Sequence, residues 1–211
     1  MDKKIAIVTF YDEKCGAFAL LTDAAKNHYC EKFGYKYFLH KERTVPERRP
    51  NWEKPNAMLS HFDDFDYVVW MDADATIVNM DFDIAELFSD KIIYMSKDIN
   101  GWNNGVFAIK TGDIARNFLE DVNMLYPDFK YAKFIEQTCM GYLMDTKYRE
   151  YVCQVPAKKW NCYDNVYKHY IDNEFCNGDF ILHLPGERGL PKTNPPYRIK
   201  RFTEINEANG I

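Results

Sequence analysis

The chain of 211 residues is 46% hydrophobic and 28% charged. This length suits one well-buried core, because domains commonly span about 100–200 residues. A net charge of −5 gives no basic field that would attract a nucleic acid. The composition therefore favours small molecules or proteins as partners.

No targeting or membrane segment is visible in the sequence. The first apolar run, residues 4–10, is far shorter than the roughly 20 residues that a spanning helix needs. The six cysteines are scattered without a C-x-x-C pair, so neither a zinc site nor a disulfide framework is indicated. We therefore expect a soluble, cytoplasmic protein with reduced thiols, either alone or as one domain of a longer chain.

The first 72 residues alternate predicted strands and helices. Residues 17–33 carry apolar side chains at helical spacing and are followed by Gly34, a typical helix terminator. A charged loop is expected over 41–51, and the remaining elements are strands at 4–10, 35–40 and 67–72 and a helix at 52–62. This order predicts right-handed crossovers and a mixed, mostly parallel sheet flanked by helices, which is the Rossmann-like α/β class.

The second half of the chain has a looser pattern. It predicts strands at 91–96, 105–110 and 179–184 and helices at 111–125 and 132–144. Residues 191–211, rich in proline and basic side chains, are expected to form an irregular wrap over the surface. Since no linker or repeat is present, we expect one domain, with a nucleotide-binding half over 1–75 and a sugar- and acceptor-binding half over 76–190.

The stretch YVVWMDADATIV, residues 67–78, ends a predicted strand with two carboxylates, Asp72 and Asp74. In an α/β sheet this end opens into the cleft where ligands bind. Two neighbouring anions repel unless a cation lies between them, and Mg²⁺ or Mn²⁺ is the usual cation. One interpretation is a nucleotide-sugar transferase whose metal neutralises a leaving diphosphate. The other is a phosphohydrolase of the haloacid dehalogenase type, with Asp72 as nucleophile, Asp74 as acid/base and Thr76 on the phosphate.

The position of this motif favours the transferase. In the phosphohydrolase class the motif ends the first strand, whereas here a complete β-α-β-α unit precedes it. That class also requires a late acidic pair after a strand, and GDFILHL offers only Asp179, which precedes its strand. Thr76 then becomes a loop or packing residue. A non-catalytic carbohydrate-binding module is a third reading, but it leaves the aspartates and His183 without a role.

Four motifs occur in a fixed order: NWEKPNAMLSHFDDFDYVVWMDADATIVN, NNGVFAIK, EQTCMGYLM and GDFILHLPG. In this order they resemble the retaining GT-A glycosyltransferases of the galactosyl/xylosyltransferase family 34, and more distantly the glycogenin-like family 8. The compact form also resembles the N-terminal glycosyltransferase domain of a chlorella-virus protein. The resemblance implies a GT-A fold, Mn²⁺ (or Mg²⁺) as cofactor, a UDP-sugar donor, retention of configuration, and a glycan or glycoprotein hydroxyl as acceptor.

Carried over residue by residue, the resemblance assigns Asp72, Asp74 and His183 to the metal, with the aspartates also reaching the donor ribose. A neutral imidazole opposite carboxylates suits Mn²⁺. Glu136 and Gln137 correspond to the family's acidic-Gln pair beneath the anomeric carbon and, with Asp74, are the expected catalytic residues. Because Gln is a poor nucleophile, a same-face displacement is implied, in which a diphosphate oxygen takes the acceptor proton.

The resemblance also places the donor. Thr9 would hydrogen-bond the base, and Tyr11 would stack on it. Asn103 and Asn104 would contact the donor sugar, although Asn104 replaces a hydroxyl residue of the family pattern. Gly105 would allow a tight turn after them.

The diphosphate has several candidate partners. Gly186 would let the backbone approach it, and Lys54 in WEKP would reach the donor or its phosphates. Ala73, between the aspartates, is also expected to contact the donor. Gly189 stands where the family 8 pattern has a lysine, so the cation that compensates departing UDP is open among Lys54, Arg188 and Lys192. The charged loop carries Arg43, Arg48 and Arg49, which could flank the donor, but we expect this loop to be solvated.

Overall fold

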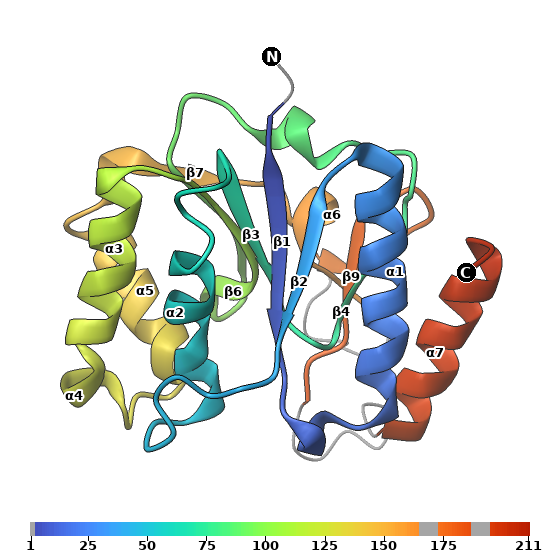
Figure 1. Cartoon of the computed structure of the whole chain (residues 1–211), viewed down its shortest axis with the longest axis horizontal. Coiled ribbons are helices and arrows are strands. Elements are labelled where there is room, and N and C mark those ends of the chain that lie inside the picture. Colours follow the sequence, from blue (N-terminus) through green and yellow to red (C-terminus); the bar gives the residue numbers. More distant parts are fainter. Residues whose placement is uncertain (1–2, 165–172, 187–194) are drawn as a thin grey trace.

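The computed structural model describes residues 3–164, 173–186 and 195–211. Its centre is a twisted sheet with helices on both faces (Figure 1). The first half follows the predicted order: β1 (Ile5–Phe10), α1 (Ala17–Phe33), β2 (Lys36–His40), α2 (Glu53–Leu59) and β3 (Tyr67–Met71). Short 3-10 helices occur at Glu13–Cys15, Pro50–Trp52, Ile84–Leu87 and Arg149–Tyr151.

Parallel pairing of β1 with both neighbours forms the nucleus of the sheet. Ile7 lies opposite Tyr37 of β2 on one side and Val69 of β3 on the other. Between β1 and β2, α1 ends at Gly34, which adopts a left-handed conformation with φ 71° and donates its N–H to the Cys30 carbonyl. These parallel connections bring the carboxyl ends of β1 and β3 to the same edge of the sheet.

The second half extends the sheet with antiparallel pairing. The long strand β6 (Gly101–Lys110) runs antiparallel to β3 and to β5 (Ile93–Asp98), and β7 (Val152–Gln154) pairs parallel to β5. The strand order is therefore β2-β1-β3-β6-β5-β7. The helices of this half are α3 (Asp113–Met124), α4 (Tyr126–Phe129), α5 (Ile135–Asp145) and α6 (Ala157–Trp160).

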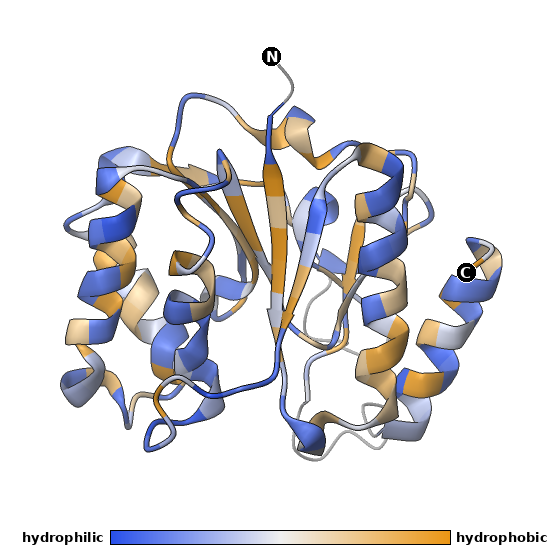
Figure 2. Ribbon diagram, viewed as in Figure 1, coloured by the Kyte–Doolittle hydropathy of each residue, from blue (hydrophilic) through white to orange (hydrophobic). Residues whose placement is uncertain are grey.

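Alternating side chains of the central strands fill two separate cores. Val8 and Trp70 face the side covered by α2, α3 and α5, while Ile7 and Val69 face the side covered by α1. Apolar residues accordingly concentrate on the strands and on the inner sides of the helices (Figure 2). A strand that is buried on both faces reads as a continuous apolar run, which is why these strands are visible in the sequence.

A second, smaller sheet carries half of the candidate site. It consists of β4 (Ala75–Ile77), β9 (Ile181–His183) and β8 (Cys162–Tyr163), in the order β4-β9-β8. Ala75 pairs antiparallel with His183. Since β4 begins directly after Asp74, the D-x-D motif forms the short link between the two sheets. Thr76 is a buried residue of β4. Of the two expectations for this residue, the packing role is correct and the position in a loop is wrong.

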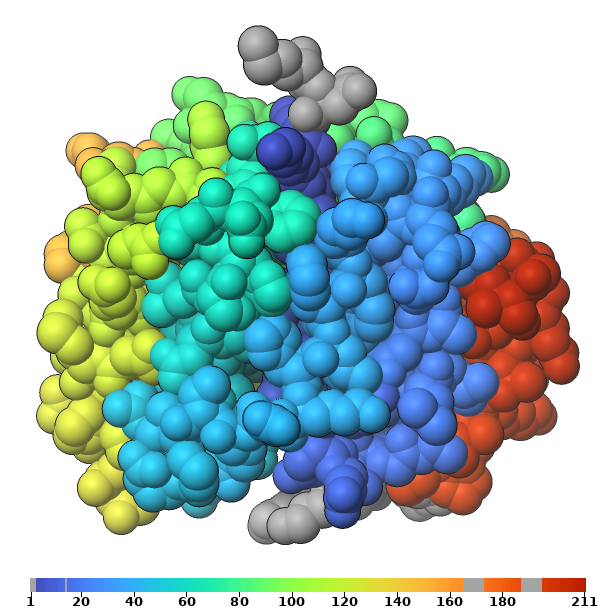
Figure 3. Space-filling model, viewed as in Figure 1, coloured from blue at the N-terminus to red at the C-terminus, as the bar shows by residue number. Residues whose placement is uncertain are grey.

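The C-terminal segment is not the expected irregular wrap, because α7 (Pro195–Ala208) is a helix. Prolines are compatible with the first turn of a helix, where their missing N–H is not needed. Phe202 and Ile205 are buried in the same apolar cluster as Phe18 of α1. In Figure 3, α7 lies against α1 at one side of the molecule. The spacing of its buried residues, rather than its composition, makes this segment helical.

All six cysteines are free thiols, as the sequence predicts. Within the described part of the chain, none of the helices is both long and apolar enough to cross a membrane.

Candidate active site

Two adjoining cavities open beyond the carboxyl ends of β1 and β3. The Tyr11 cavity, about 360 Å³, is lined by residues that include Tyr11, Asp12, Cys15, Phe18, Ala73 and Arg198. The His183 cavity, about 370 Å³, is lined by residues that include Asn103, Asn104, Glu136, Gln137, His183 and Gly186. Both are bounded by the same four residues at their junction: Asn51, Lys54, Asp72 and Asp74.

The Asp72 side chain is held in place by two donors. The Trp70 indole N–H donates to its Oδ1 over 2.7 Å, and the Lys54 Nζ lies 3.1 Å from the same atom. The Asp72 N–H donates to the Gly105 carbonyl over 2.7 Å. These contacts fix the first carboxylate of the D-x-D motif at the end of β3.

Asp74 faces two different groups. Its Oδ1 lies 3.2 Å from the His183 Nε2, and its Oδ2 accepts from the Arg198 Nη2 over 3.2 Å. Burial opposes ionisation of Asp74, but the contacts with His183 and Arg198 outweigh it and hold the pKa of this carboxyl below its ordinary value. Asp74 is therefore an anion at neutral pH.

The side chains of Asp72, Asp74 and His183 form a candidate metal centre. One ligand atom from each lies within 4.8 Å of the others. Two carboxylate oxygens and an imidazole nitrogen are a donor set that accommodates Mn²⁺, and the carboxylates also suit Mg²⁺. The three residues thus fit the divalent cation that the sequence predicts.

A chain of amides sets the tautomer of His183. The Gly105 N–H can only donate, and it donates to the Asn103 Oδ1 over 2.9 Å. The Asn161 Nδ2 also donates to this oxygen, over 2.8 Å, so the Asn161 Oδ1 is the atom that lies 2.9 Å from the His183 Nδ1. His183 must then carry a proton on Nδ1. Nε2 is the nitrogen that faces Asp74, and its lone pair could bind a metal when it carries no proton. Asp98 anchors the chain, because its Oδ2 accepts from the Asn103 Nδ2 over 2.8 Å.

Gly105 does not form the expected tight turn, since it lies inside β6. The ladder between β5 and β6 shifts register here, because Met95 pairs with Phe107 whereas Ser96 pairs with Asn103. Bulges of this kind re-aim side chains beside active sites. A Cβ atom on Gly105 would lie 2.3 Å from the His183 Cε1, so glycine is required at this position to leave room for the imidazole.

Lys54 bridges the two halves of the site. Its Nζ lies 3.1 Å from both Asp72 and Glu136 and donates to the Asn104 Oδ1 over 3.1 Å. Burial disfavours the charge of Lys54, but the two carboxylates raise the pKa of this ammonium. The Glu136 Oε2 is buried without a hydrogen-bond partner among the described residues. Glu136 is therefore buried, ion-paired with Lys54 and part of the lining of the His183 cavity, and it is not a solvated helix carboxylate.

Gln137 lies beside Glu136 in the first turn of α5. Its Oε1 accepts from the Asn104 N–H over 3.3 Å. The preceding Ile135 has φ 49°, a strained conformation for a β-branched residue. This strain at the start of α5 accompanies the placement of Glu136 and Gln137 at the cavity wall.

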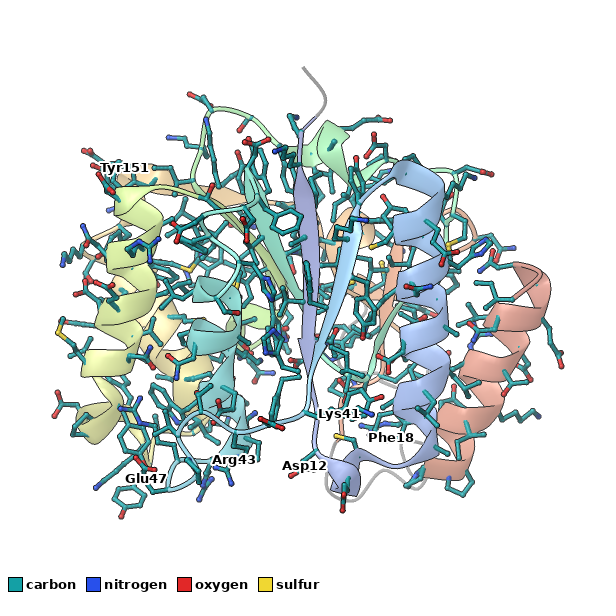
Figure 4. All side chains as sticks on the ribbon, in the orientation of Figure 1. Asp12, Phe18, Lys41, Arg43, Glu47 and Tyr151 are labelled. Atoms are coloured by element: carbon teal, nitrogen blue, oxygen red, sulfur yellow. The ribbon has the colours of Figure 1, made fainter. Side chains whose placement is uncertain are left out.

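The Tyr11 cavity joins aromatic and polar groups. Tyr11 and Tyr37 both donate to Asp23, which fixes the Tyr11 ring, and burial followed by Asp23 raises the pKa of Tyr11. Phe18 and Asp12 contribute to the same cavity. Figure 4 shows Asp12 and Phe18 at the end of the molecule that also carries the loop after β2.

Not all predicted donor residues reach the cavities. Thr9 does not, because its buried hydroxyl donates to the Met71 carbonyl over 2.9 Å and stays inside the sheet. Gly186 does line the His183 cavity, and a Cβ there would lie 3.1 Å from the Arg198 Nη2. Arg188 and Lys192 lie outside the described residues.

The arginines of the loop after β2 have structural partners or remain at the surface. Arg48 donates to the Asn123 Oδ1 over 3.1 Å and stacks on Tyr126, while the Arg43 Nε lies 3.9 Å from Glu53. Arg49 is exposed, as expected. Neither cavity is lined by any of the three.

Several supporting residues are not predicted by the motifs. On α1, Thr22 donates to the Ala73 carbonyl over 2.8 Å and Lys26 donates to the Asp72 carbonyl over 3.0 Å. Burial lowers the pKa of Lys26 to about 8. Thr22 and Lys26 therefore fix the backbone of the D-x-D link through two of its carbonyl groups. Their sequence gives one signal: Thr22 and Lys26 are polar residues spaced i, i+4, on the face of α1 that carries its buried apolar residues.

Solved glycosyltransferases share this fold at low sequence identity. A glycosyltransferase involved in the glycosylation of the major capsid of PBCV-1 aligns with a TM-score of 0.69 and 14% identity, covering 96% of this chain and 99% of that chain. The galactosyltransferase LgtC, in complex with donor and acceptor sugar analogues, aligns with a TM-score of 0.56 and 12% identity, covering 96% and 95%. GlyE of Streptococcus pneumoniae TIGR4 gives a TM-score of 0.60 and 14% identity, covering 98% and 63%. No curated protein matches the chain.

The chain thus has the GT-A fold of these glycosyltransferases. The sequence itself matches the galactosyl transferase GMA12/MNN10 family over residues 2–91 and 88–188, and the chain belongs to this family. The resemblance drawn from the four motifs is confirmed, and sugar transfer is favoured over phosphate ester hydrolysis.

Proposed function

We propose that this glycosyltransferase moves a sugar from a UDP-sugar to a glycan hydroxyl, depends on Mn²⁺, and retains the anomeric configuration. The observation that carries the proposal is the position of the Asp72, Asp74 and His183 cluster at the junction of the two cavities. A diphosphate held there would have its nucleoside on one side and its sugar on the other.

The Tyr11 cavity suits the nucleoside. Tyr11 and Phe18 offer apolar ring surface to a base, and Ala73 leaves the ribose a small neighbour between the aspartates. The His183 cavity suits the sugar, because the amides of Asn103 and Gln137 line it. Hydrogen bonds from such groups select sugars by their ring hydroxyls.

The reaction exchanges one carbon–oxygen bond for another. The bond from the anomeric carbon to the β-phosphate oxygen breaks, its electron pair leaves with UDP, and the acceptor oxygen bonds to the same carbon. A divalent cation, when bound, would neutralise the charge that develops on the diphosphate. The acceptor proton goes to a diphosphate oxygen. Gln137 is a poor nucleophile, so we assign its amide to the wall of the His183 cavity beneath the anomeric carbon.

An acceptor path continues from the His183 cavity. A neighbouring groove shares four of its residues and adds aromatic and small side chains; the shared residues are Asn100, Lys133, Phe134 and Gln137. Trp102 and Tyr142 line this groove, and Tyr142 is 52% exposed. Rings beside amides are suitable contacts for a glycan, whose CH faces are apolar and whose hydroxyls are polar.

A UDP-release screen tests the proposal. The protein is incubated with a panel of UDP-sugars and Mn²⁺, without acceptor and then with mono- and disaccharides. We expect slow UDP release from one donor, acceleration by one class of acceptor, and loss of both with EDTA or with Asp74→Asn. Anomeric NMR of the product then reports the configuration. Release of phosphate from p-nitrophenyl phosphate in place of UDP would contradict the proposal.

A further inference from the structure

Each carboxylate of the D-x-D motif has its own basic partner. Lys54 contacts Asp72 and is also tied to Glu136 and Asn104, so it remains anchored whatever Asp72 binds. Arg198 contacts Asp74 from a different direction, because it belongs to the C-terminal helix α7. Its carboxylate contact is with Asp74 alone among the described residues, which makes it the more transferable cation.

Arg198 is buried at the wall of the Tyr11 cavity. It is only 8% exposed, and its guanidinium carbon lies 4.8 Å from the centre of the Phe18 ring. Its Nη2 binds Asp74, while its buried Nε has no hydrogen-bond partner within the part of the chain that the structure describes. A buried donor without a partner is costly, and it points to a missing acceptor in this cavity.

A bound divalent cation would conflict with this arrangement. Asp74 could bind the metal through Oδ1 while its Oδ2 accepts from Arg198, but the metal and the guanidinium would then share the charge of one carboxylate. The guanidinium would also repel a second cation placed a few ångströms away in a partly buried site. A diphosphate removes the conflict, because its oxygens match the planar donor fork of arginine.

We propose that Arg198 is an exchangeable cation, which neutralises Asp74 in the nucleotide-free protein and moves to the diphosphate when metal and nucleotide bind together. The inference rests on the proposed function and adds a coupling to it. Without UDP, the metal competes with Arg198 for Asp74 and binds weakly. With UDP, Arg198 moves to the diphosphate, and the metal and the nucleotide bind together. Gly186 supports the exchange, since a side chain there would approach the Nη2 to 3.1 Å.

The decisive experiment compares wild type with Arg198→Met, which keeps an unbranched apolar stem against Phe18 but removes the charge. Electron paramagnetic resonance of free Mn²⁺ gives the metal affinity without nucleotide, and calorimetry gives the UDP affinity at saturating Mn²⁺. We expect Mn²⁺ alone to bind about fivefold more tightly to the variant and UDP to bind about tenfold more weakly. A merely structural defect would weaken both.

Two further variants serve as controls. Arg198→Lys retains the charge and should restore weak binding of Mn²⁺ alone. Arg201→Met removes an arginine from the same helix whose partners are Asp164, at 2.8 Å, and Glu204, and it should change neither affinity. Circular dichroism and thermal melting establish that each variant is folded.

The outcomes separate this inference from the proposed function. If wild type fails to bind UDP with Mn²⁺, the proposed function itself is wrong. If wild type binds UDP only with Mn²⁺ but Arg198→Met leaves both affinities unchanged, or lowers both, the exchange is wrong and the proposed function stands.

Discussion

Single side chains around His183 decide whether the imidazole can serve as a metal ligand. A free neutral histidine can place its proton on either nitrogen, and only a lone pair on Nε2 faces Asp74. Asn161 removes this freedom by accepting from Nδ1, and Asn103 in turn orients Asn161. Partners behind the ligands of a metal commonly change its affinity by about 10–100-fold when they are lost.

Replacing Asn161 with leucine should therefore weaken metal binding without touching a ligand. We expect Mn²⁺ affinity in the presence of UDP to fall about tenfold, and ¹⁵N NMR of His183 to show the proton on Nε2. Asn206→Leu is the control, because Asn206 is also buried but donates to the Leu21 carbonyl of α1 and takes no part in the amide chain. An unchanged tautomer in Asn161→Leu would show that the amide chain does not control His183.

Gly105→Ala tests the space reserved for the imidazole. The added Cβ would lie 2.3 Å from the His183 Cε1 and 2.7 Å from Nδ1, so the ring must shift. We expect a loss of about 1–3 kcal/mol in the free energy of unfolding, as for other overpacked sites, together with weaker Mn²⁺ binding. Gly141→Ala is the matched control, since its Cβ would meet Trp102 at 3.4 Å. Equal stability of the two variants in urea denaturation would refute the steric argument.

The motif residues could be predicted because they are adjacent in sequence and chemically distinctive. Asp72, Asp74, Glu136 and Gln137 stand in short patterns, and His183 lies in a recognisable strand. Asn161, Lys26 and Arg198 are ordinary residues far from those patterns. Only the packing of α1, α7 and β8 brings them to the site. Their roles depend on tertiary contacts that no local pattern records.

His40 of β2 and His61, which follows α2, form a pair that makes the stability of the fold depend on pH. The Nε2 atoms of His40 and His61 are 2.9 Å apart, so at least one ring is neutral. Burial, followed by the neighbouring His40, lowers the pKa of His61 to about 4, and burial also lowers the pKa of His40. The unfolded chain, with histidine pKa values near 6.5, binds more protons between about pH 4 and pH 6.5. Stability therefore falls as the pH drops through this window.

His61→Gln should remove part of that acid sensitivity. We expect the drop in melting temperature from pH 7.5 to pH 5 to be smaller than in wild type by about 2 °C, a modest figure because His61 is half-buried and screened by solvent. His28→Gln, at an exposed position of α1, should leave the drop unchanged. If His61→Gln and wild type lose the same number of degrees, the pair does not contribute to the acid sensitivity.

Helices and strands whose apolar residues recur regularly, or that contain a long apolar run, could be predicted from the sequence. Short elements could not. The helix α1 and the strands β1, β3 and β6 are long enough for their burial pattern to appear in the sequence. The strands β4 and β8 have three and two residues, too few for a periodic signal. The helix α7 was missed because its prolines and charges suggested an irregular segment, although its buried positions recur at helical spacing.

The arrangement of the whole molecule explains why the site lies where it does. Parallel β1 and β3 bring their carboxyl ends together, and the antiparallel strand β6 pairs with β3 and adds Asn103 and Asn104 to the same edge. The small sheet then brings His183 opposite Ala75. The α/β class follows from the order of elements, but the insertion of β6 beside β3 does not, because strand pairing over long sequence separations leaves no local trace.

The central claim, that Asp72 and Asp74 hold a cation which binds UDP, is tested most directly by calorimetry. UDP is titrated into wild type and into the Asp72→Ala, Asp74→Ala double variant, each with Mn²⁺ and with EDTA. Wild type should bind UDP only with Mn²⁺, and the folded double variant should show no metal-dependent binding, because the remaining ligand, His183, cannot hold the cation by itself. Metal-dependent UDP binding that survives in the double variant would contradict the claim.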